Sequence, residues 1–489
     1  MANKLSRAFA LNASLALLTI GVGWQTPALA KAPPSGFAAL PKSQQVMLND
    51  LEKRTFQWFW DSADPKTGLI PDHYPGQSFS SIAAVGFGLT AYGVGVERGY
   101  ITRAQATERT LTTLRFFHDV AQNDSEDDAA GFHGFFYHFL NMQTGKRQGR
   151  GTELSSVDTT WLMGGVLFAQ SYYDRDTPQE QEIRRLADEL YRGVDWPWMQ
   201  ARRPLISMGW TPGGKFIPAD WKGYDEGKLV YLLALGSPTH PIGDDAWAAW
   251  CSTYQHTWGS FHGQQFLNFA PLFGHQYTES WIDFRGIRDA WSREHGLDYF
   301  ENGRRAAYSQ RDYAIANPGH WTDYGKNVWG LTASNGPGDI VVKDQRGNER
   351  KFYSYTARGA GLDNITDDGT IAPTAAAGSI AFAPEIVVPA LQEMEHRYGA
   401  QVYDQYGFVD AFNPSFHTRT ETRTGALQPA QGWFDTMQLG IDQGPIVLML
   451  ENWRSDFVWK VMKRNPYIRK GLQRADFQGG WLDKAAPAP

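Results

Sequence analysis

Helical stretches of two kinds alternate along this chain. Residues 81–98, 156–173 and 225–235 are apolar almost throughout, whereas residues 102–121 and 178–194 carry charged residues at helical spacing. A helix that is apolar on every face has to be buried, and an amphipathic helix covers such a core from the solvent side. The alternation therefore predicts inner helices surrounded by a layer of outer helices.

The same patterns predict further helices and few strands. Helical spacing of apolar residues recurs over 46–61, 244–257, 281–294, 299–317, 384–398, 445–456 and 457–463. Residues 131–140 are expected to be extended, and 339–342 and 351–355 to form one β-hairpin. Because no repeat of fixed period is present, a simple solenoid is not expected. We expect helix pairs stacked in two concentric layers, in a single catalytic domain over residues 45–480.

The first 30 residues have the pattern of a secretory signal peptide. Lys4 and Arg7 precede the mostly apolar stretch 8–22, and Ala28-Leu29-Ala30 matches a small-residue cleavage site. Residues 31–44 are rich in proline and alanine and are expected to be flexible. The sequence therefore predicts a periplasmic or secreted protein, and no later stretch predicts insertion into a membrane.

Composition narrows the classes of partner. Without Lys4 and Arg7 the chain has 44 basic against 52 acidic residues, a net charge of −8, which argues against nucleic acid as a partner. Cys251 is the only cysteine, so no internal disulfide can form. Aromatic residues make up 14% of the chain. They suit the apolar faces of sugar rings, although a large helical core also buries them.

Acidic residues recur where the expected inner helices begin. Glu153 and Asp158 flank the start of one, Asp225 and Glu226 begin the next, and Asp442 precedes the last. If the inner helices run in the same direction, their N-terminal ends meet at one rim, and the acids line one pocket. Each acid also has an ordinary explanation, because Ser155 and Asp158 form a capping-box variant and helix dipoles favour acids at N-termini.

Paired carboxyls at such a rim are the residues that glycoside hydrolysis requires. One protonated carboxyl has to face the leaving oxygen, and one carboxylate has to activate water or attack the sugar. A helix dipole would lower the pKa of Glu226, so burial near Trp210, Trp221 and Tyr224 would have to outweigh it. The sequence has no Walker loop, HExxH or Gly-x-Ser-x-Gly motif. We expect no cofactor and no metal, and His133 and His138 are expected to pack or to bind sugar.

Four groups of motifs together resemble the bacterial glycoamylase-like domain, and within it the endo-β-1,2-glucanases of glycoside hydrolase family 144. The motifs are Glu153-Leu-Ser-Ser-Val-Asp-Thr159; Tyr224-Asp-Glu226 followed by 233–241; Phe273-Gly-His-Gln-Tyr277 with 281–285; and Asp368-Gly-Thr-Ile-Ala-Pro-Thr374 with 440–445. The resemblance spans nearly the whole chain after the signal peptide. It implies an all-α fold, an (α/α)6 barrel, with a minor β-hairpin.

The resemblance also implies a β-glucan oligosaccharide or polysaccharide as substrate. It implies cleavage of β-1,2-glucan to sophoro-oligosaccharides, with inversion, by Glu226 as the general acid. Asp442 matches the base, and Glu153 is held in reserve for that role. The expected substrate-binding residues are Asp158, Trp161, Trp210, Tyr224, Asp225, His275, Tyr277, Trp281, Arg285 and Trp329.

Three alternatives stay open at this point. Related domains are exo-acting sophorohydrolases or transglycosylases, because the loops at the ends of a cleft decide where a glucan chain is cut. A non-catalytic glucan-binding protein with a decayed site is a third alternative.

Overall fold

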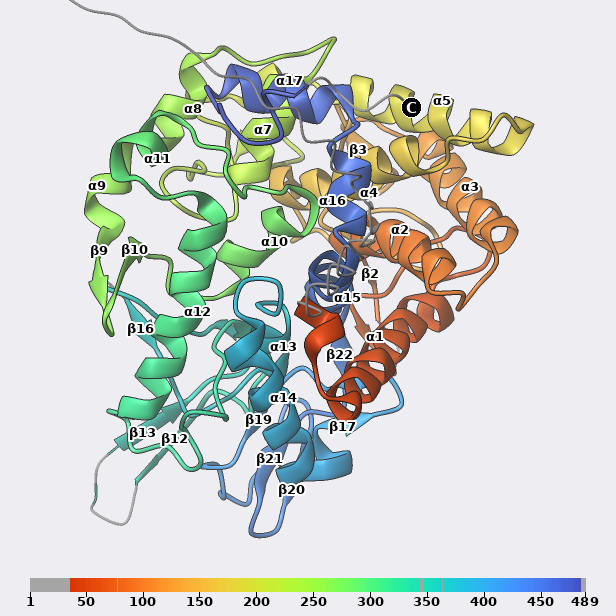
Figure 1. Cartoon of the computed structure of the whole chain (residues 1–489). Coiled ribbons are helices and arrows are strands. Elements are labelled where there is room, and N and C mark those ends of the chain that lie inside the picture. The colour runs from red at the N-terminus through yellow and green to blue at the C-terminus, as the bar shows by residue number, and fades with distance from the viewer. Residues whose placement is uncertain (1–35, 77, 344–346, 348, 363, 485–489) are drawn as a thin grey trace, which may run out of the picture. The chain divides into compact units, whose positions relative to one another are not determined.

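The computed structural model describes residues 36–484 except 77, 344–346, 348 and 363. The predicted signal peptide, residues 1–30, and residues 31–35 lie outside the described residues. Helices dominate the described part, and short strands connect them (Figure 1).

Six helices form the inner layer. They are α2 (Ile82–Glu97), α4 (Ser156–Tyr172), α7 (Lys228–Gly236), α10 (Phe273–Trp281), α13 (Pro373–Ala377) and α15 (Gly440–Ser455). Helix α2 packs against α4 and α15, α4 packs against α7, and α13 packs against α15. The remaining two joints are polar: Lys228 pairs with Glu279 between α7 and α10, and Gln276 donates to the Ala375 carbonyl between α10 and α13. The six helices therefore close a ring.

Outer helices alternate with the inner ones along the chain. They are α1 (Lys42–Ser62), α3 (Arg103–Asp119), α5 (Pro178–Gly193), α8 (Asp245–Trp250), α12 (Tyr299–Ala316) and α14 (Pro384–Tyr398). In Figure 1, α1, α3, α5 and α12 lie at the periphery and α10 and α15 lie nearer the middle. The predicted all-α (α/α)6 barrel is thereby confirmed. The other helices are η1 (Gly36–Ala39), α6 (Trp196–Met199), η2 (Cys251–Thr253), α9 (Tyr254–Thr257), α11 (Ala290–His295), η3 (Gly399–Gln401), α16 (Phe457–Met462) and α17 (Pro466–Arg474).

Helix α16 closes one end of the ring. It follows α15 directly and packs against α2, α4 and α10. The Trp459 indole donates to the carbonyl of Glu279 near the end of α10, and Arg464 donates to the carbonyl of Ser171 near the end of α4. The C-terminal ends of these inner helices are therefore covered.

The described residues also form ten sheets of two or three strands. The strands are β1 (His73–Tyr74), β2 (Ser80–Ser81), β3 (Gly131–Phe132), β4 (Phe135–Phe136), β5 (Phe139–Leu140), β6 (Leu154–Ser155), β7 (Gly209–Thr211), β8 (Lys215–Phe216), β9 (Trp258–Phe261), β10 (Gln264–Leu267), β11 (Ala333–Ser334), β12 (Ile340–Lys343), β13 (Glu349–Phe352), β14 (Thr356–Ala357), β15 (Gly359–Ala360), β16 (Ile365–Thr366), β17 (Tyr403–Asp404), β18 (Gly407–Phe408), β19 (Phe412–Asn413), β20 (Ala426–Gln428), β21 (Gly432–Phe434) and β22 (Gln438–Leu439).

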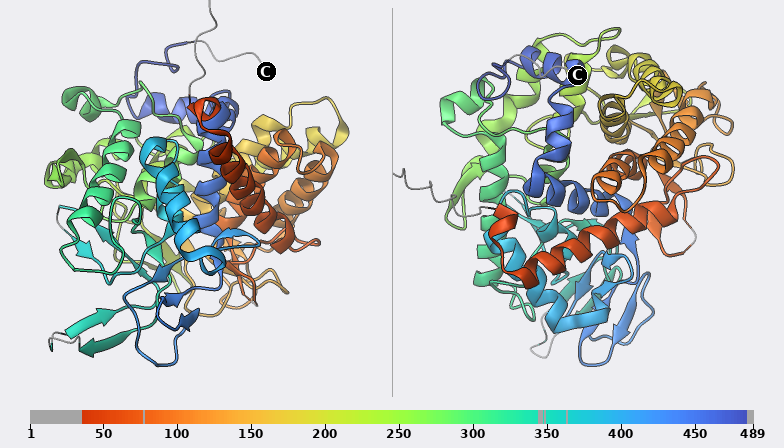
Figure 2. Two further views of the ribbon diagram at one scale, coloured as in Figure 1. Left: turned by 60° about the horizontal axis from the view of Figure 1, so that its bottom comes forward. Right: turned by 45° about the vertical axis from the view of Figure 1, so that its right-hand side comes forward.

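These sheets belong mainly to the segments that lead into the inner helices. Strand β2 precedes α2, β6 precedes α4 and β22 precedes α15, and they pair with β5, β7 and β1 respectively. The predicted hairpin is β12 with β13, in which Ile340 lies opposite Phe352, and it reaches beyond the helices in Figure 2. The structure thus has many more hairpins than the one predicted.

Some predicted boundaries were wrong. Residues 281–294 are not one helix, because Trp281 ends α10 and only Ala290–His295 are helical afterwards. Helix α10 carries the buried polar residues His275, Gln276 and Glu279, which hide its apolar periodicity. Helix α15 begins at Gly440, so Pro445 lies inside it and is not its first residue.

The segment predicted to be flexible, residues 31–44, is helical in its second part. Residues 36–39 are helical and α1 begins at Lys42. The ring of Phe37 lies edge-on to Trp453 at 5.7 Å, and the Arg454 guanidinium lies 4.3 Å from the ring centre of Phe37.

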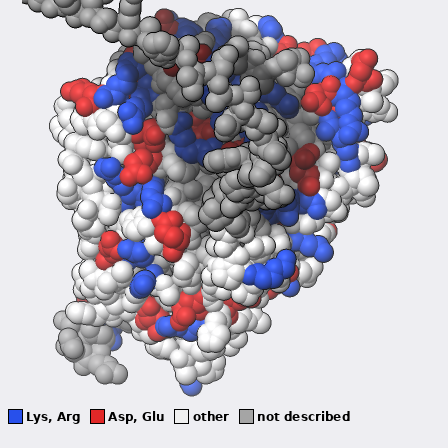
Figure 3. Space-filling view, viewed as in Figure 1, with Lys and Arg blue, Asp and Glu red and all other residues white. Residues whose placement is uncertain are grey.

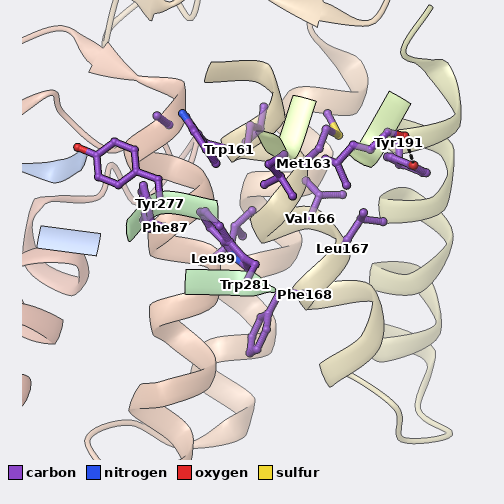
Figure 4. Packing of buried hydrophobic residues seen from close by; sticks show 14 of the residues in the cluster. Phe87, Leu89, Trp161, Met163, Val166, Leu167, Phe168, Tyr191, Tyr277 and Trp281 are labelled. Atoms are coloured by element: carbon purple, nitrogen blue, oxygen red, sulfur yellow. Dashed lines mark hydrogen bonds between the residues drawn. The ribbon is translucent and has the colours of Figure 1, made fainter. Parts of the chain in front are cut away.

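Glycines let α2 and α4 approach closely. A Cβ atom added at Gly86 would lie 2.1 Å from the Trp161 carbonyl oxygen, and one at Gly165 would lie 2.1 Å from the Gly86 carbonyl oxygen. Beside this contact the Trp281 ring stacks on Phe87 at 4.6 Å and on Trp161 at 6.0 Å (Figure 4). The inner ring is therefore packed without space for an extra methyl group at this crossing.

We predict that Gly86→Ala lowers the free energy of unfolding by about 2–3 kcal/mol, because backbone atoms cannot move aside easily. Gly193→Ala is the matched control, since a Cβ there meets nothing within 4 Å. This control should leave the free energy unchanged or raise it by up to about 1 kcal/mol. Denaturant unfolding followed by circular dichroism measures both, and equal effects of the two substitutions would contradict the packing argument.

Candidate active site

Two adjoining cavities open at the N-terminal ends of the inner helices. They share the residues His138, Tyr355 and Ile441, so we describe them as the two halves of one cleft. The acidic half, of about 330 Å³, is lined by His138, Glu153, Ser155, Val157, Asp158, Met208, Ile217, Trp221, Glu226, Phe273, Tyr277, Ala333, Tyr355 and Ile441.

The second half of the cleft has about 450 Å³. It is lined by Asp72, His73, Phe79, Ser81, His138, Phe139, Asn335, Gly336, Ser354, Tyr355, Arg423, Thr424, Met437, Leu439 and Ile441. The starts of α2, α4, α7, α10 and α15 all contribute to the two linings. Five inner helices therefore begin at one rim and run in the same direction away from it.

Glu226 enters the acidic half from the loop before α7. Its carboxyl makes no hydrogen bond with the residues that the structure describes. Burial, together with the neighbouring Asp158 and Asp225 carboxylates, raises the pKa of Glu226 to about 8. The residue precedes the helix cap Gly227, and burial outweighs any influence of the helix dipole on its pKa. Glu226 therefore carries a proton at neutral pH, as a general acid requires.

His138 connects the other two acids of this half. Its Nδ1 lies 2.9 Å from Glu153 Oε1, and its Nε2 lies 3.4 Å from Asp158 Oδ1. Burial lowers the pKa of the imidazole, but the two carboxylates outweigh it and bring the pKa to about 9. Burial likewise opposes a low pKa for Glu153, but the hydrogen bond from His138 prevails and lowers it. The Glu153 side chain is therefore a carboxylate that is already paired with a charged histidine, His138.

Asp158 is both a cap and part of the cleft. Its backbone N–H donates to the Ser155 hydroxyl at 3.1 Å, and that hydroxyl donates back to Asp158 Oδ2. Burial raises the pKa of the Asp158 carboxyl. Asp158 thus forms a helix cap with Ser155 and also lines the cleft, so the structural and the functional interpretation of this acid do not exclude each other.

Asp442 lies in the first turn of α15, where it is buried and lines neither half of the cleft, unlike its neighbour Ile441. The Tyr277 hydroxyl donates to Asp442 Oδ1 at 3.1 Å, whereas Asp442 Oδ2 is buried without a partner. Burial raises the pKa of Asp442 to about 7, against the hydrogen bond from Tyr277. The phenol of Tyr277 is close enough to feel the charges of both Asp442 and Glu226. Tyr277 therefore lies near both carboxyls that were predicted to act as acid and base.

Tyr355 was not predicted from the sequence. It lies in the loop between β13 and β14 and lines both halves of the cleft, and its side chain is 54% exposed. Its phenol feels the carboxyls of Asp442, Asp72, Asp410 and Glu226. An exposed aromatic ring at this position suits the apolar face of a sugar. The only signal in the sequence was its place at the end of the predicted hairpin.

Three predicted substrate-binding residues lie behind the cleft. The Tyr224 hydroxyl lies 2.9 Å from His275 Nδ1, and His275 Nε2 lies 3.1 Å from the Phe269 carbonyl oxygen, to which it donates. Tyr224 therefore donates to Nδ1, and burial lowers the pKa of His275 to about 3. Asp225 accepts hydrogen bonds from the Gly227 N–H and the Trp250 indole. These contacts hold the loop that carries Glu226.

Four tryptophans expected to hold glucose are packed in the core. Trp161, Trp281 and Trp329 are fully buried and line neither half of the cleft, and Trp210 packs against Trp198. Arg285 follows the C-terminal end of α10, opposite the rim, and pairs with Asp283 and Asp456. The structure thus corrects these five assignments, because the sequence pattern did not show which aromatic residues face inward.

The described part of the chain shows neither a metal-binding cluster nor a membrane span. It contains no cluster of three or more His, Cys, Asp or Glu residues that could hold a metal ion. None of its helices is long and apolar enough to span a membrane. On the face shown in Figure 3, the described basic and acidic residues are interspersed.

The chain was also compared with known proteins. The glycoamylase family model, described as "Putative glucoamylase", matches residues 218–466. A solved structure with the same description, from Bacteroides uniformis, is 31% identical with a TM-score of 0.76, covering 91% of this chain and all of that one. An endo-β-1,2-glucanase from Chitinophaga pinensis, solved with sophorotriose and glucose, is 29% identical with a TM-score of 0.76, covering 90% of this chain and all of that one.

One curated relative is an exo-β-1,2-glucooligosaccharide sophorohydrolase (non-reducing end) from Parabacteroides distasonis. It is 27% identical over 467 residues, which are 89% of this chain. The chain spans 58% of the length of that relative. The Chitinophaga and Parabacteroides relatives are therefore glycoside hydrolases that act on β-1,2-linked glucose chains, one in the endo and the other in the exo mode.

We predict that Glu226→Gln stabilises the fold at alkaline pH. Between pH 4.5 and 8 the folded chain keeps a proton on Glu226 that the unfolded chain releases, so this residue lowers stability as the pH rises. The substitution should raise the free energy of unfolding by about 1–3 kcal/mol near pH 8, with little difference near pH 5. Thermal unfolding at the two pH values measures this, and a destabilised variant near pH 8 would contradict it.

Proposed function

The chain belongs to the glycoamylase family, and we propose that it is a periplasmic or secreted glycoside hydrolase that cleaves β-1,2-glucan to sophoro-oligosaccharides. One observation carries this proposal: a carboxyl that stays protonated at neutral pH, Glu226, lines a cleft together with Tyr277, whose hydroxyl donates to the buried Asp442 carboxyl. The β-1,2 linkage is taken from the glucanase and sophorohydrolase relatives.

The proposed reaction uses one proton donor and one proton acceptor. The Glu226 carboxyl gives its proton to the glycosidic oxygen as the bond between that oxygen and the sugar carbon breaks. A water molecule attacks the same carbon from the opposite face and loses a proton to the Asp442 carboxylate. We favour Asp442 over Glu153 as the base because His138 already occupies the Glu153 carboxylate. Attack from the opposite face makes inversion the proposed outcome.

The shape of the cleft supports endo attack. The second half continues beyond His138 and Tyr355, away from Glu226, and adds apolar rings from Phe79 and Phe139. Each half has the volume of an ordinary small-ligand site, so sugar units can bind on both sides of the shared residues. Exo release of sophorose is the second candidate, and the Parabacteroides relative favours it. Transglycosylation is the third.

We predict that linear β-1,2-glucan is hydrolysed, whereas β-1,3- and α-1,4-glucans are not. Endo attack should give mixed sophoro-oligosaccharides from the first time points, as measured by chromatographic sizing of the products. Sophorose alone from the start would establish the exo mode, and products longer than the substrate would establish transglycosylation. No products from β-1,2-glucan would overturn the proposed substrate.

We predict that Glu226→Gln lowers kcat by about 10³-fold or more while the variant still binds glucan, because general acid catalysis is lost. Glu52→Gln is the matched control. Burial raises the pKa of Glu52 to about 8 as well, but Glu52 lies in α1, pairs with Arg454 and lines neither half of the cleft. Kinetics and calorimetric binding on both variants measure the difference, and full turnover in Glu226→Gln would remove this residue from the proposed role.

A further inference from the structure

Three buried carboxyls, that of Asp442 among them, lie close together. Asp410 lies between β18 and β19, Asp435 follows β21, and Asp442 lies in the first turn of α15. Their exposed fractions are 0%, 1% and 4%. Asp410 lines neither half of the cleft, and the sequence analysis did not single it out.

Asn335 ties two of these carboxyls to the cleft. Its backbone N–H donates to Asp410 Oδ2 at 2.6 Å, and its side-chain amide donates to Asp435 Oδ2 at 2.8 Å. Asp435 Oδ1 also accepts a hydrogen bond, from the Thr436 N–H at 2.7 Å. Both oxygens of Asp435 are therefore bound by donors, as an ionised carboxylate requires.

The other two carboxyls each have one oxygen without a donor. Asp410 Oδ1 and Asp442 Oδ2 are buried and unpaired, and the two side chains are within hydrogen-bonding reach of each other. Two acceptors cannot bond to each other, and leaving both unpaired in the interior costs free energy. A single proton held between them satisfies both oxygens.

The surroundings decide which carboxyl keeps this proton. Asp442 already accepts a hydrogen bond from Tyr277, which stabilises its ionised form. Asp410 is completely buried and lies beside the Asp435 carboxylate, which disfavours a second charge. Burial and the neighbouring carboxylates raise the pKa of Asp410 well above its ordinary value. The proton therefore belongs to Asp410.

We propose that Asp410 is a positioning residue whose protonated carboxyl donates a hydrogen bond from Oδ1 to Asp442 Oδ2, keeping Asp442 ionised and held against Tyr277, which lines the cleft. The part of this proposal that concerns catalysis rests on the proposed function, in which Asp442 is the base. The hydrogen bond itself is a property of the protein without substrate.

Two substitutions at Asp410 differ in whether residue 410 can still donate a hydrogen bond to Asp442, while both remove the carboxyl group. In Asp410→Asn the amide oxygen can accept from Asn335 N–H, which directs the NH2 group toward Asp442 and preserves a donor. In Asp410→Leu the donor is lost. We expect kcat within about fivefold of the wild type for Asp410→Asn, and a loss of about tenfold or more at neutral pH for Asp410→Leu.

The pH dependence of kcat/KM shows whether Asp410 favours or opposes the ionisation of Asp442. Without the donor, Asp442 becomes harder to ionise, so the acidic limb of the profile should move to higher pH by about one unit in Asp410→Leu. The basic limb, which belongs to Glu226, should stay in place. If Asp410 were itself ionised, removing its charge would move the acidic limb to lower pH. The titratable or charged groups that face the pair are Asp72, Tyr277, Tyr355 and Asp435, and His73 faces Asp435.

A movement of the acidic limb to lower pH, no movement, or equal damage by Asp410→Asn and Asp410→Leu would overturn the proposal. Glu52→Gln, the buried carboxyl outside the cleft, should leave the acidic limb unchanged. Infrared difference spectra of wild type against Asp410→Asn, without substrate, should show the carbonyl band of a protonated carboxyl at neutral pH. The infrared measurement tests the hydrogen bond even if Asp410→Leu does not fold or if the wild type does not hydrolyse β-1,2-glucan. Absence of the band would overturn the proposal.

Discussion

A carboxyl group stays protonated at neutral pH where burial and nearby negative charges outweigh the attraction of nearby cations. At Glu226 this condition is met by the ring of inner helices, five of which begin at the cleft. Helix starts usually stabilise negative charge, so the rim by itself favours carboxylates. The loop before α7 instead places Glu226 ahead of the helix cap, where burial and two neighbouring acids prevail.

The same rim shows how three acids acquire different properties in a small space. Glu153 is kept ionised by His138, and Glu226 is kept neutral by burial without a donor. Asp442 is intermediate, with one hydrogen bond from Tyr277 and one from the carboxyl behind it. The hydrogen-bond partners therefore distinguish these residues more than their position along the inner helices does.

Much of this arrangement followed from the sequence, because apolar and amphipathic helices differ in composition and the acids precede the apolar ones. The short helices α10 and α13 escaped prediction. Buried polar side chains such as Gln276 and Glu279 join α10 to its neighbours, and they disrupt the periodicity that marks a helix. Trp161 and Trp281 were misassigned because packing and sugar binding use the same residue types. Asp410 and Asp435 lie in loops whose meeting point depends on the whole fold, so no local pattern indicated them.

The joint between α7 and α10 has a consequence for the evolutionary history of such a chain. Lys228 Nζ lies 2.5 Å from Glu279 Oε1, both side chains are fully buried, and the rings of Tyr224, Phe284 and Tyr299 surround the ammonium group. Loss of either partner would strand the other charge in the interior, at a cost of about 3–5 kcal/mol. These two positions, 51 residues apart, are thus expected to co-vary among descendants of a common ancestor, with an uncharged pair as the alternative to Lys and Glu.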